Sequence, residues 1–183
     1  MKDINDLIDL SEESDDDLST LEDMFQDLSV DGPSKEQLYA MYGVFLKDFI
    51  KNPMIIDGKN LKVNVARSKH PLCKGKLIGF EHIITRENKY KGLRDFDSVR
   101  ANKIHWIKII LSNAADKRIK YFEAINDKGL NQKFYWYEKK SFIIILREIN
   151  PDVMLITAFS IDTGNENKYK YLYEEHKKTS LRK

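Results

Sequence analysis

The spacing of apolar residues changes along the chain, from a helical period to the alternation of a β-strand. Early apolar positions recur every three or four residues, which places them on one face of a helix. They are Leu38, Met41, Tyr42, Phe45 and Phe49. Ser34 stands where an N-cap residue belongs, and Gln37 follows three residues later, as in a capping box. A first core helix is therefore predicted from Ser34 to the Asn52-Pro53 pair.

Four elements are predicted between this helix and residue 112. Apolar residues on both sides of an Asp-Gly turn favour a hairpin, and a mixed stretch after it favours a strand. A charged, glycine-containing stretch favours a loop, and a return to helical spacing favours a helix capped by Asp97 or Ser98. In chain order the ranges are 54–65 for the hairpin, 74–85 for the strand, 86–97 for the loop and 98–112 for the helix.

The second half of the chain alternates apolar and polar residues, which is typical of strands. Four consecutive antiparallel strands are predicted, joined by turns that contain Asn, Asp, Gly and Pro. They span residues 119–125, 133–137, 141–148 and 153–161. The last two are nearly unbroken apolar runs and are predicted to be central strands. Residues 169–178 are compatible with either a basic terminal helix or a frayed end.

Together these elements predict an α+β domain, with N-terminal helices packed on one face of a four-stranded antiparallel sheet and an extra β-hairpin. The other face of the sheet is then expected to be free for a ligand. A chain of 183 residues suits one domain and a tail. Residues 34–183 are predicted to form the domain, and residues 1–33 an acidic, marginally ordered leader.

Charge divides the chain in the same way. Residues 1–32 hold twelve Asp and Glu and one Lys, a balance of −11, whereas the remaining residues carry a balance of +13. A basic body with interleaved aromatic residues suits a polyanion such as RNA. The leader contains two short stretches with helical spacing, which predict marginal helices. It is either a solubilising tail, a segment that folds on a partner, or a cover that mimics nucleic acid on the basic body.

Composition excludes several classes of protein. The single cysteine, Cys73, excludes an intramolecular disulfide and a multi-cysteine metal site, and it suits a reducing cytoplasm. Apolar runs are too short to cross a bilayer, and acids stand where a signal peptide needs apolar residues. Glycine-rich phosphate loops are missing, and the clustered acids lie in the leader. We therefore expect a cytoplasmic protein with no membrane partner, no cofactor and no metal.

The remaining polar side chains suit metal-free cleavage of RNA. The ribose 2′-hydroxyl is an internal nucleophile, so the protein supplies only a base, an acid and cations for the charged phosphorane. Histidine transfers protons near neutral pH, arginine grips phosphate oxygens, and aromatic rings stack bases.

His82 is the first candidate, because it lies in an ordered segment with Arg86 just beyond it. A histidine with apolar neighbours is nevertheless more often structural. Arg94 and Arg100 flank a predicted helix start, where each either binds phosphate or forms an ion pair with a nearby Asp. Thr157, in the middle of an apolar strand, is either an ordinary β-branched residue or a hydroxyl that holds a phosphate oxygen.

Several motifs follow one another between residues 72 and 161. They are Gly79-Phe80-Glu81-His82-Ile83, Arg100 and Trp106 on a helix, Phe134-Tyr135-Trp136, Phe142–Arg147 and Leu155-Ile156-Thr157-Ala158-Phe159. In this order they resemble the barnase–EndoU–colicin–RelE-like ribonuclease superfamily, particularly its phage-borne nuclease branch. The resemblance implies a helical part followed by a four-stranded antiparallel sheet, and RNA cleavage without a metal. The acidic leader and the hairpin at 54–65 lie outside the family pattern.

The resemblance also implies roles for particular residues. His82 is expected to be the acid or base, Arg86 and Arg100 to bind phosphate, and Thr157 to orient a phosphate or base. Further RNA-binding residues are expected at Arg94, Tyr135, Trp136 and Arg147. An aromatic run of this kind is nevertheless more often core or sheet cover than a platform for bases, and alternation allows only part of it to face RNA.

The function predicted from the sequence is therefore a metal-independent RNA endonuclease of toxin type. The alternative is a non-catalytic RNA-binding or protein-adaptor module that uses the basic domain and the acidic leader. RNA is the expected partner, together with an inhibitor, antitoxin or regulatory protein that contacts residues 1–33.

Overall fold

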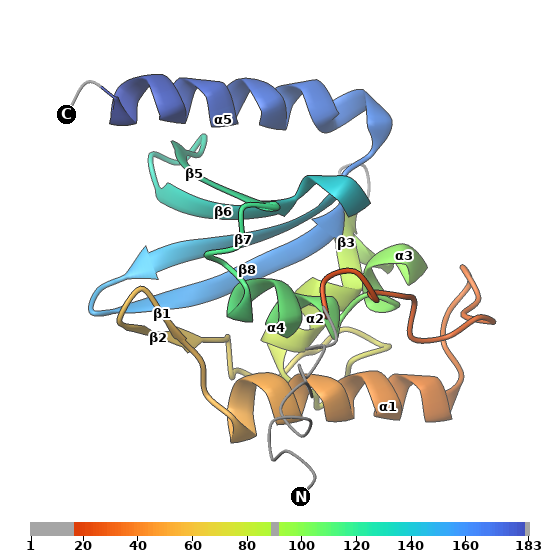
Figure 1. Ribbon diagram of the computed structural model, residues 1–183. Helices are drawn as coiled ribbons and strands as arrows, with labels where there is room; N and C mark the ends of the chain where they lie inside the picture. The colour runs from red at the N-terminus through yellow and green to blue at the C-terminus, as the bar shows by residue number, and fades with distance from the viewer. Residues whose placement is uncertain (1–16, 89–91, 182–183) are drawn as a thin grey trace, which may run out of the picture.

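The computed structural model describes residues 17–88 and 92–181 (Figure 1). Its centre is a six-stranded mixed sheet with the strand order β1-β2-β8-β7-β6-β5. The strands are β1 (Ile55–Ile56), β2 (Lys59–Lys62), β5 (Ile119–Ile125), β6 (Asn131–Tyr137), β7 (Phe142–Ile149) and β8 (Asp152–Ser160). Neighbouring strands are antiparallel except β2 and β8, which are parallel.

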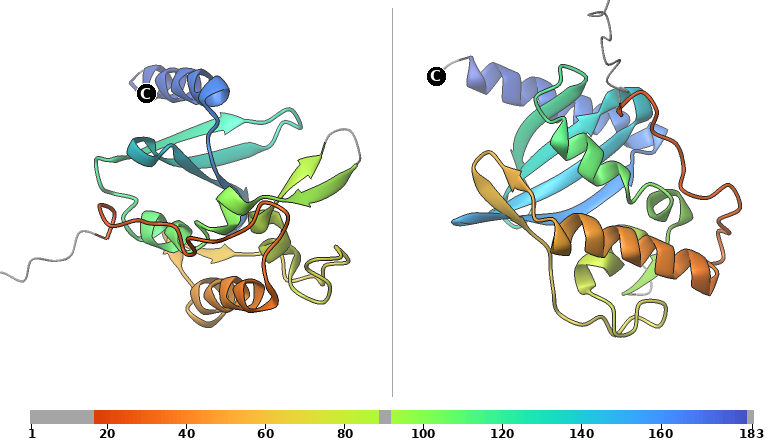
Figure 2. Two further views of the ribbon diagram at one scale, coloured as in Figure 1. Left: turned by 90° about the vertical axis from the view of Figure 1, so that its right-hand side faces the viewer. Right: turned by 60° about the horizontal axis from the view of Figure 1, so that its bottom comes forward.

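The predicted fold class is wrong in its sheet and in its helix layout. The predicted hairpin does form, but it extends the sheet, because β2 pairs with β8 through Leu61 opposite Val153. The sheet therefore has six strands of mixed direction instead of four antiparallel ones. It curls, as Figure 2 shows, and a helix at the C-terminus covers the face that was expected to be open.

Five α-helices within the described residues pack around the sheet. They are α1 (Lys35–Leu46), α2 (Ile78–Ile84), α3 (Ser98–Ala101), α4 (Trp106–Ser112) and α5 (Glu166–Ser180). A π-helical turn (Lys47–Lys51) continues α1, and 3-10 turns span Glu138–Lys140 and Thr163–Asn165. The capping box is confirmed, since Gln37 N–H donates to Ser34 Oγ at 3.1 Å and Ser34 N–H to Gln37 Oε1 at 2.9 Å.

Two local predictions before residue 112 are wrong. The predicted strand at 74–85 contains helix α2, and the predicted loop at 86–97 is a hairpin of β3 (Thr85–Asn88) and β4 (Leu93–Phe96). Gly79 lets α2 approach the chain after β2, because a Cβ there would lie 3.2 Å from the backbone N and O of Asn64. This close packing, which no local pattern reveals, favours the helix.

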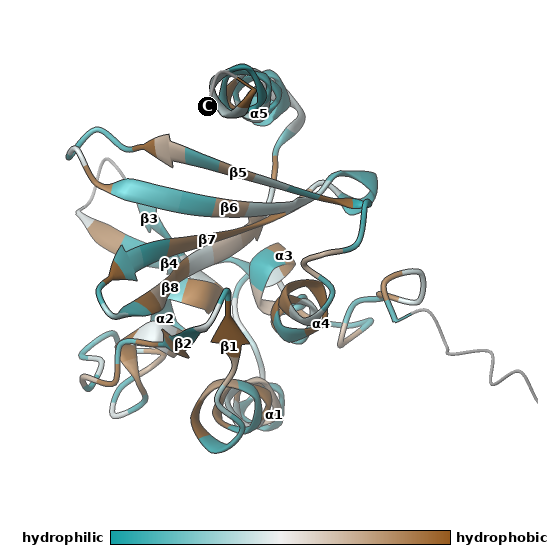
Figure 3. Cartoon of the chain, turned by 60° about the vertical axis from the view of Figure 1, so that its left-hand side comes forward, coloured by the Kyte–Doolittle hydropathy of each residue, from teal (hydrophilic) through white to brown (hydrophobic). Residues whose placement is uncertain are grey.

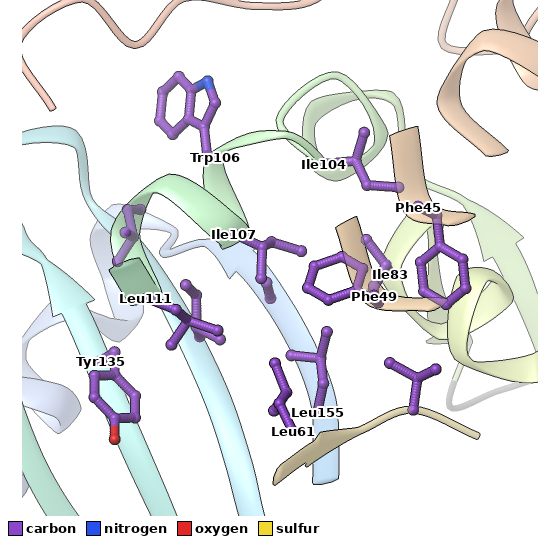
Figure 4. Close-up of a cluster of buried hydrophobic side chains, with 14 of the residues drawn as sticks. Phe45, Phe49, Leu61, Ile83, Ile104, Trp106, Ile107, Leu111, Tyr135 and Leu155 are labelled. Atoms are coloured by element: carbon purple, nitrogen blue, oxygen red, sulfur yellow. The ribbon is translucent and has the colours of Figure 1, made fainter. Parts of the chain in front are cut away.

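Apolar side chains form two clusters on opposite faces of the sheet. The larger one lies between the sheet and helices α1 to α4 and includes Phe45, Phe49, Leu61, Ile107 and Leu155 (Figure 4). The smaller one lies under α5, which Figure 3 shows on the opposite side of the sheet from α1 and α4. Successive side chains of β6 point to opposite faces of the sheet, so this strand contributes residues to both clusters. No helix among the described residues combines the length and apolarity needed to span a membrane.

Residues 17–32, the described part of the predicted leader, form an acidic strap that packs on the body. Leu18 and Leu21 are 0% and 3% exposed. The indole N–H of Trp106 donates to the Glu22 carbonyl at 2.8 Å, and Lys103 Nζ lies 2.9 Å from Asp23 Oδ1. The strap contains turns and bends but no helix, so the second predicted leader helix is wrong. The first predicted leader helix lies outside the described residues.

Candidate active site

The end of α2, the β3–β4 hairpin, α3 and β8 meet around Thr85. Thr85 ends α2, and its hydroxyl donates to the Glu81 carbonyl at 2.6 Å. The N–H of Asp97 donates to the Ile84 carbonyl at 2.9 Å, which brings the start of α3 beside the end of α2. The hydroxyl of Thr157 on β8 reaches the His82 carbonyl at 3.5 Å. These bonds bring together segments that are as much as 75 residues apart in the chain.

Arg100 is the most enclosed cation of this junction. Its Nη1 donates to the Thr85 carbonyl at 3.1 Å and to the Thr157 hydroxyl at 3.3 Å. The guanidinium carbon lies 4.9 Å from the centre of the Phe159 ring. Its Nε is buried and has no hydrogen-bond partner, although Asp97 Oδ2 lies 3.5 Å away. Burial lowers the pKa of Arg100, but a guanidinium remains charged at neutral pH.

Asp97 connects Arg100 with a second arginine. One carboxylate oxygen accepts the backbone N–H of Arg100 at 3.1 Å and so caps α3. The other lies 3.5 Å from Nε of Arg100 and 4.0 Å from Nε of Arg86. The Arg86 side chain is 64% exposed, whereas that of Arg100 is only 16% exposed. One carboxylate thus holds two guanidinium groups on the same side of the junction.

A cavity of about 280 Å³ opens beside these two arginines. Arg86, Asp97 and Arg100 form one side of it. The other side comes from the end of β8 and the start of α5, with Ser160, Asn165 and Tyr169. The hydroxyl oxygen of Ser160 is buried without a hydrogen-bond partner. The cavity is therefore lined by two cations and by two carboxylates, those of Asp97 and Asp162, and the pair of arginines can attract an anionic ligand of small size.

Arg94 also lies at this junction, but it has a structural role. Its Nε donates to the Thr85 hydroxyl at 2.8 Å and its Nη2 to the Thr85 carbonyl at 2.9 Å. Its ion-pair partner is Glu81, at 3.8 Å, and Glu81 in turn accepts the Ser68 hydroxyl at 2.6 Å. Arg94 does not line the cavity. Each of the two arginines predicted to flank the helix start therefore forms an ion pair with a carboxylate, Arg94 with Glu81 and Arg100 with Asp97. Only Arg100 also lines the cavity.

His82, the predicted acid or base, is partly buried on α2. Burial, and to a lesser degree the charge of Arg94, lower the pKa of its imidazole. The ring is thus neutral at neutral pH. It does not line the cavity, and His82 is connected to the cavity only through Thr157, whose hydroxyl bonds to the His82 carbonyl and accepts from Arg100.

Three predicted RNA-binding residues lie away from the cavity. Tyr135 and Trp136 are 2% and 0% exposed and face opposite clusters, so neither ring is open to a stacked base. The Tyr135 hydroxyl is instead 3.3 Å from Asp57 Oδ2. Arg147 pairs with Met154, near the start of β8, whereas the cavity lies at the opposite end of that strand. Burial and sheet register remove these residues from the candidate site.

Two further histidines, His70 and His176, and the cysteine have structural positions. His70 Nδ1 accepts the Leu72 N–H at 3.2 Å, so its Nε2 carries the proton and donates to the Arg94 carbonyl at 2.8 Å. His176 Nδ1 accepts the N–H of Glu123 at 3.2 Å on the edge strand β5. Cys73 is fully buried, and burial raises the pKa of its thiol to about 12.

Sequence reasoning missed the cavity residues that come from the end of β8 and from α5. Ser160, Asn165 and Tyr169 belong to segments predicted as a strand end, a connection and a terminal helix or frayed end. Only the folding of α5 back over the sheet places them beside Arg100, and no sequence spacing records that return. Asp97 was foreseen as a helix cap and as an ion-pair partner, but not as the carboxylate that two arginines share.

Comparison of the chain with protein-family models, curated proteins and solved structures gives no match. Among the described residues, no group of three or more His, Cys, Asp or Glu side chains is arranged to hold a metal ion.

Proposed function

We propose that the protein is a metal-independent RNA endonuclease, with Arg86 and Arg100 as the groups that bind the scissile phosphate. One observation carries the proposal: the largely buried guanidinium of Arg100 and the exposed guanidinium of Arg86 line the same cavity. Two neighbouring guanidinium groups attract an anion of the size of a phosphate. A phosphodiester supplies oxygens for both arginines.

Cleavage in this proposal uses the ribose itself as the nucleophile. The 2′-oxygen attacks phosphorus and loses its proton to a base, the P–O5′ bond breaks, and the 5′-oxygen takes up a proton. The products are a 2′,3′-cyclic phosphate and a free 5′-hydroxyl. The two arginines stabilise the additional negative charge of the phosphorane.

His82 is the proposed base, because its lowered pKa leaves the imidazole neutral and able to accept a proton. Its helix is connected to Arg100 through Thr157, which bonds to the His82 carbonyl and to the guanidinium. In the proposed site Thr157 acts through Arg100, whose guanidinium it holds, and not as a phosphate ligand of its own.

A second function, non-catalytic RNA binding, is favoured by the same observation on His82. An imidazole that does not line the phosphate cavity is poorly placed to take a proton from a substrate bound there. A binding module needs only the cations, and its RNA affinity falls steeply with salt.

The test is cleavage of a mixed-sequence RNA by the purified chain in excess EDTA. The endonuclease predicts products with 2′,3′-cyclic phosphate ends, and a loss of at least 100-fold in rate for both His82→Gln and Arg100→Gln. The matched controls, His176→Gln and Arg147→Gln, lie outside the cavity and retain the wild-type rate. RNA binding without products from the wild-type chain would instead establish the binding module.

We propose further that the protein acts in the cytoplasm and that acidic residues of 1–33 bind an inhibitor or regulatory protein. The strap does not line the cavity, so residues 17–32 do not cover the arginines directly. Residues 1–16 carry seven Asp and Glu and one Lys. If residues 1–16 lie over the basic site, a chain that lacks them binds RNA more tightly than the full chain at low salt. Added salt screens these charges, so the two RNA affinities become more similar. Equal affinities of the two chains would exclude such a cover.

A further inference from the structure

Tyr169 lines the cavity that Arg86 and Arg100 also line, and its phenol lies within electrostatic reach of the Arg100 guanidinium. It lies in the first turn of α5, just after the last strand of the sheet. Its ring packs on Phe134 and Phe159, each with its centre 6.2 Å away. Phe159 also carries the guanidinium of Arg100 at 4.9 Å. The phenol and the guanidinium are therefore positioned by the same phenyl ring, one from α5 and the other from α3.

We infer that Tyr169 is a second catalytic residue, which donates its hydroxyl proton to the 5′-oxygen that leaves the scissile phosphate. The inference rests on the proposed endonuclease function. The step balances: the P–O5′ bond breaks with its electron pair on O5′, the Tyr169 O–H bond gives its proton to that oxygen, and a tyrosinate remains. The proton that the base removed from the 2′-hydroxyl, or a proton from water, restores the phenol afterwards.

The other polar side chains of the cavity are less suited to this step. Asp97 and Asp162 carry carboxylates, which only accept hydrogen bonds when ionised, and Asp97 is engaged with the backbone N–H of Arg100 and with two guanidinium groups. Asn165 carries an amide, which is a far weaker acid than a phenol. Ser160 has a hydroxyl, but an aliphatic alcohol is a much weaker acid than a phenol. Arginine holds its proton too tightly to give it up at neutral pH. Tyrosine is the cavity residue that carries a transferable proton at neutral pH and has a stabilised anion.

The surroundings of Tyr169 favour both states that the step requires. Burial raises the pKa of its phenol, which keeps the hydroxyl protonated before the reaction. The charge of Arg100 acts in the opposite direction and stabilises the tyrosinate that forms when the proton leaves. Lys168 Nζ, 5.9 Å from the centre of the ring, adds a second cation close by.

The experiment compares Tyr169→Phe with wild type on two kinds of substrate. One is RNA, whose 5′-oxygen needs a proton in order to leave. The other is the set of ribonucleoside 3′-(4-nitrophenyl phosphate) esters, whose nitrophenolate leaves without one. Phenylalanine keeps the ring contacts with Phe134 and Phe159. The control is Tyr173→Phe, one turn further along α5, whose ring packs on Phe122 at 6.0 Å and does not line the cavity.

We expect Tyr169→Phe to lower kcat on RNA by about 100-fold with little change in KM. On the nitrophenyl esters we expect a loss below about fivefold, and Tyr173→Phe should match wild type on both. Equal losses on the two substrates would assign Tyr169 a merely structural role, and an unchanged rate on RNA would exclude any role; either result overturns the inference while leaving the endonuclease in place. Wild-type protein that cuts neither substrate would remove both proposals.

Discussion

Arg100 and Thr157 lie 57 positions apart in the chain, yet Nη1 of the arginine is 3.3 Å from the hydroxyl oxygen of the threonine. The bond joins α3 to β8 across the end of α2. The same Nη1 also donates to the Thr85 carbonyl at 3.1 Å, and Nε lies 3.5 Å from Asp97 Oδ2, so the guanidinium is fixed in place where it lines the cavity. The hydroxyl of Thr157 is thus occupied by an arginine and by the His82 carbonyl, so its effect on a bound phosphate is exerted through Arg100.

Replacing the threonine hydroxyl is expected to weaken phosphate binding without unfolding the protein. Thr157→Val keeps the shape of the side chain but removes a hydrogen bond to a charged group, worth about 1.5–3 kcal/mol. Affinity for inorganic phosphate or a short RNA should then fall roughly tenfold or more, since each 1.4 kcal/mol is a factor of ten. Thr157→Ser keeps the hydroxyl and should retain most of the affinity. Isothermal titration calorimetry of wild type, Thr157→Val and Thr157→Ser measures the three affinities. Equal affinities of wild type and Thr157→Val would show that Thr157 does not contribute to phosphate binding.

The strand pattern of the second half could be predicted from sequence because it depends on alternation within each strand. Residues 119–125 and 153–161 form strands almost as predicted, and β7 and β8 are the central pair. What failed depends on contacts between distant segments. The parallel pairing of β2 with β8 and the burial of the second face under α5 leave no local signal. A charged hairpin such as β3–β4 lacks apolar alternation, so its sequence pattern predicts a loop.

The candidate site could be predicted from the sequence to about the same extent as the fold. Arg86, Arg100 and Thr157 were chosen by residue type and position, and the fold brings them to one junction. Tyr135 and Trp136 were chosen for their rings, but a central strand with two covered faces buries both. The residues that complete the cavity come from the end of β8, the turn after it and the start of α5, whose positions are set by tertiary contacts.

The carboxylate of Asp97 is expected to limit anion binding, because it partly neutralises Arg86 and Arg100. Asp97→Asn removes the charge but keeps an oxygen that can accept the Arg100 N–H and cap α3. Phosphate affinity should therefore rise several-fold, with a cost in stability below about 1 kcal/mol.

The matched control for that change is Asp95→Asn on β4. Asp95 accepts a hydrogen bond from the Asn88 amide at 2.6 Å and does not line the cavity. Asp95→Asn changes the net charge of the protein by the same amount as Asp97→Asn, but away from the two arginines. A similar gain in phosphate affinity for both variants would reveal a general charge effect and contradict a specific role for Asp97.

Stability is expected to fall as the pH is lowered from about 7.5 to about 5. Burial lowers the pKa of His82 and of His105, so each binds a proton less readily in the folded state than in the unfolded state. Around and below the unfolded value of about 6.5, the unfolded chain therefore binds more protons, and the free energy of unfolding decreases with falling pH. Urea unfolding at a series of pH values measures the slope. His82→Gln should make the free energy of unfolding less dependent on pH. A free energy of unfolding that stays constant or rises toward pH 5 would contradict the lowered pKa of the two histidines.

The acidic strap is expected to stabilise the fold. Leu18 is fully buried, and its carbonyl accepts the Tyr137 hydroxyl at 3.1 Å. Leu18→Ala should lower the free energy of unfolding by about 2–4 kcal/mol, as for other buried leucines. Val30→Ala, at a position that is 76% exposed in the same segment, is the control and should change it by less than about 0.5 kcal/mol. Denaturant unfolding gives both values.

A large effect of Leu18→Ala on stability also decides which part of the leader can be deleted in a binding experiment. The contacts of Glu22 with Trp106 and of Asp23 with Lys103 hold the strap on α4 and on the turn before it. Removing residues 1–32 as a whole would expose the core positions under Leu18 and Leu21, so any change in RNA binding would mix unfolding with the loss of acidic charge. Removing only residues 1–16 leaves these contacts intact and isolates the charge. If Leu18→Ala is as stable as wild type, the strap is dispensable and the longer deletion becomes the simpler test.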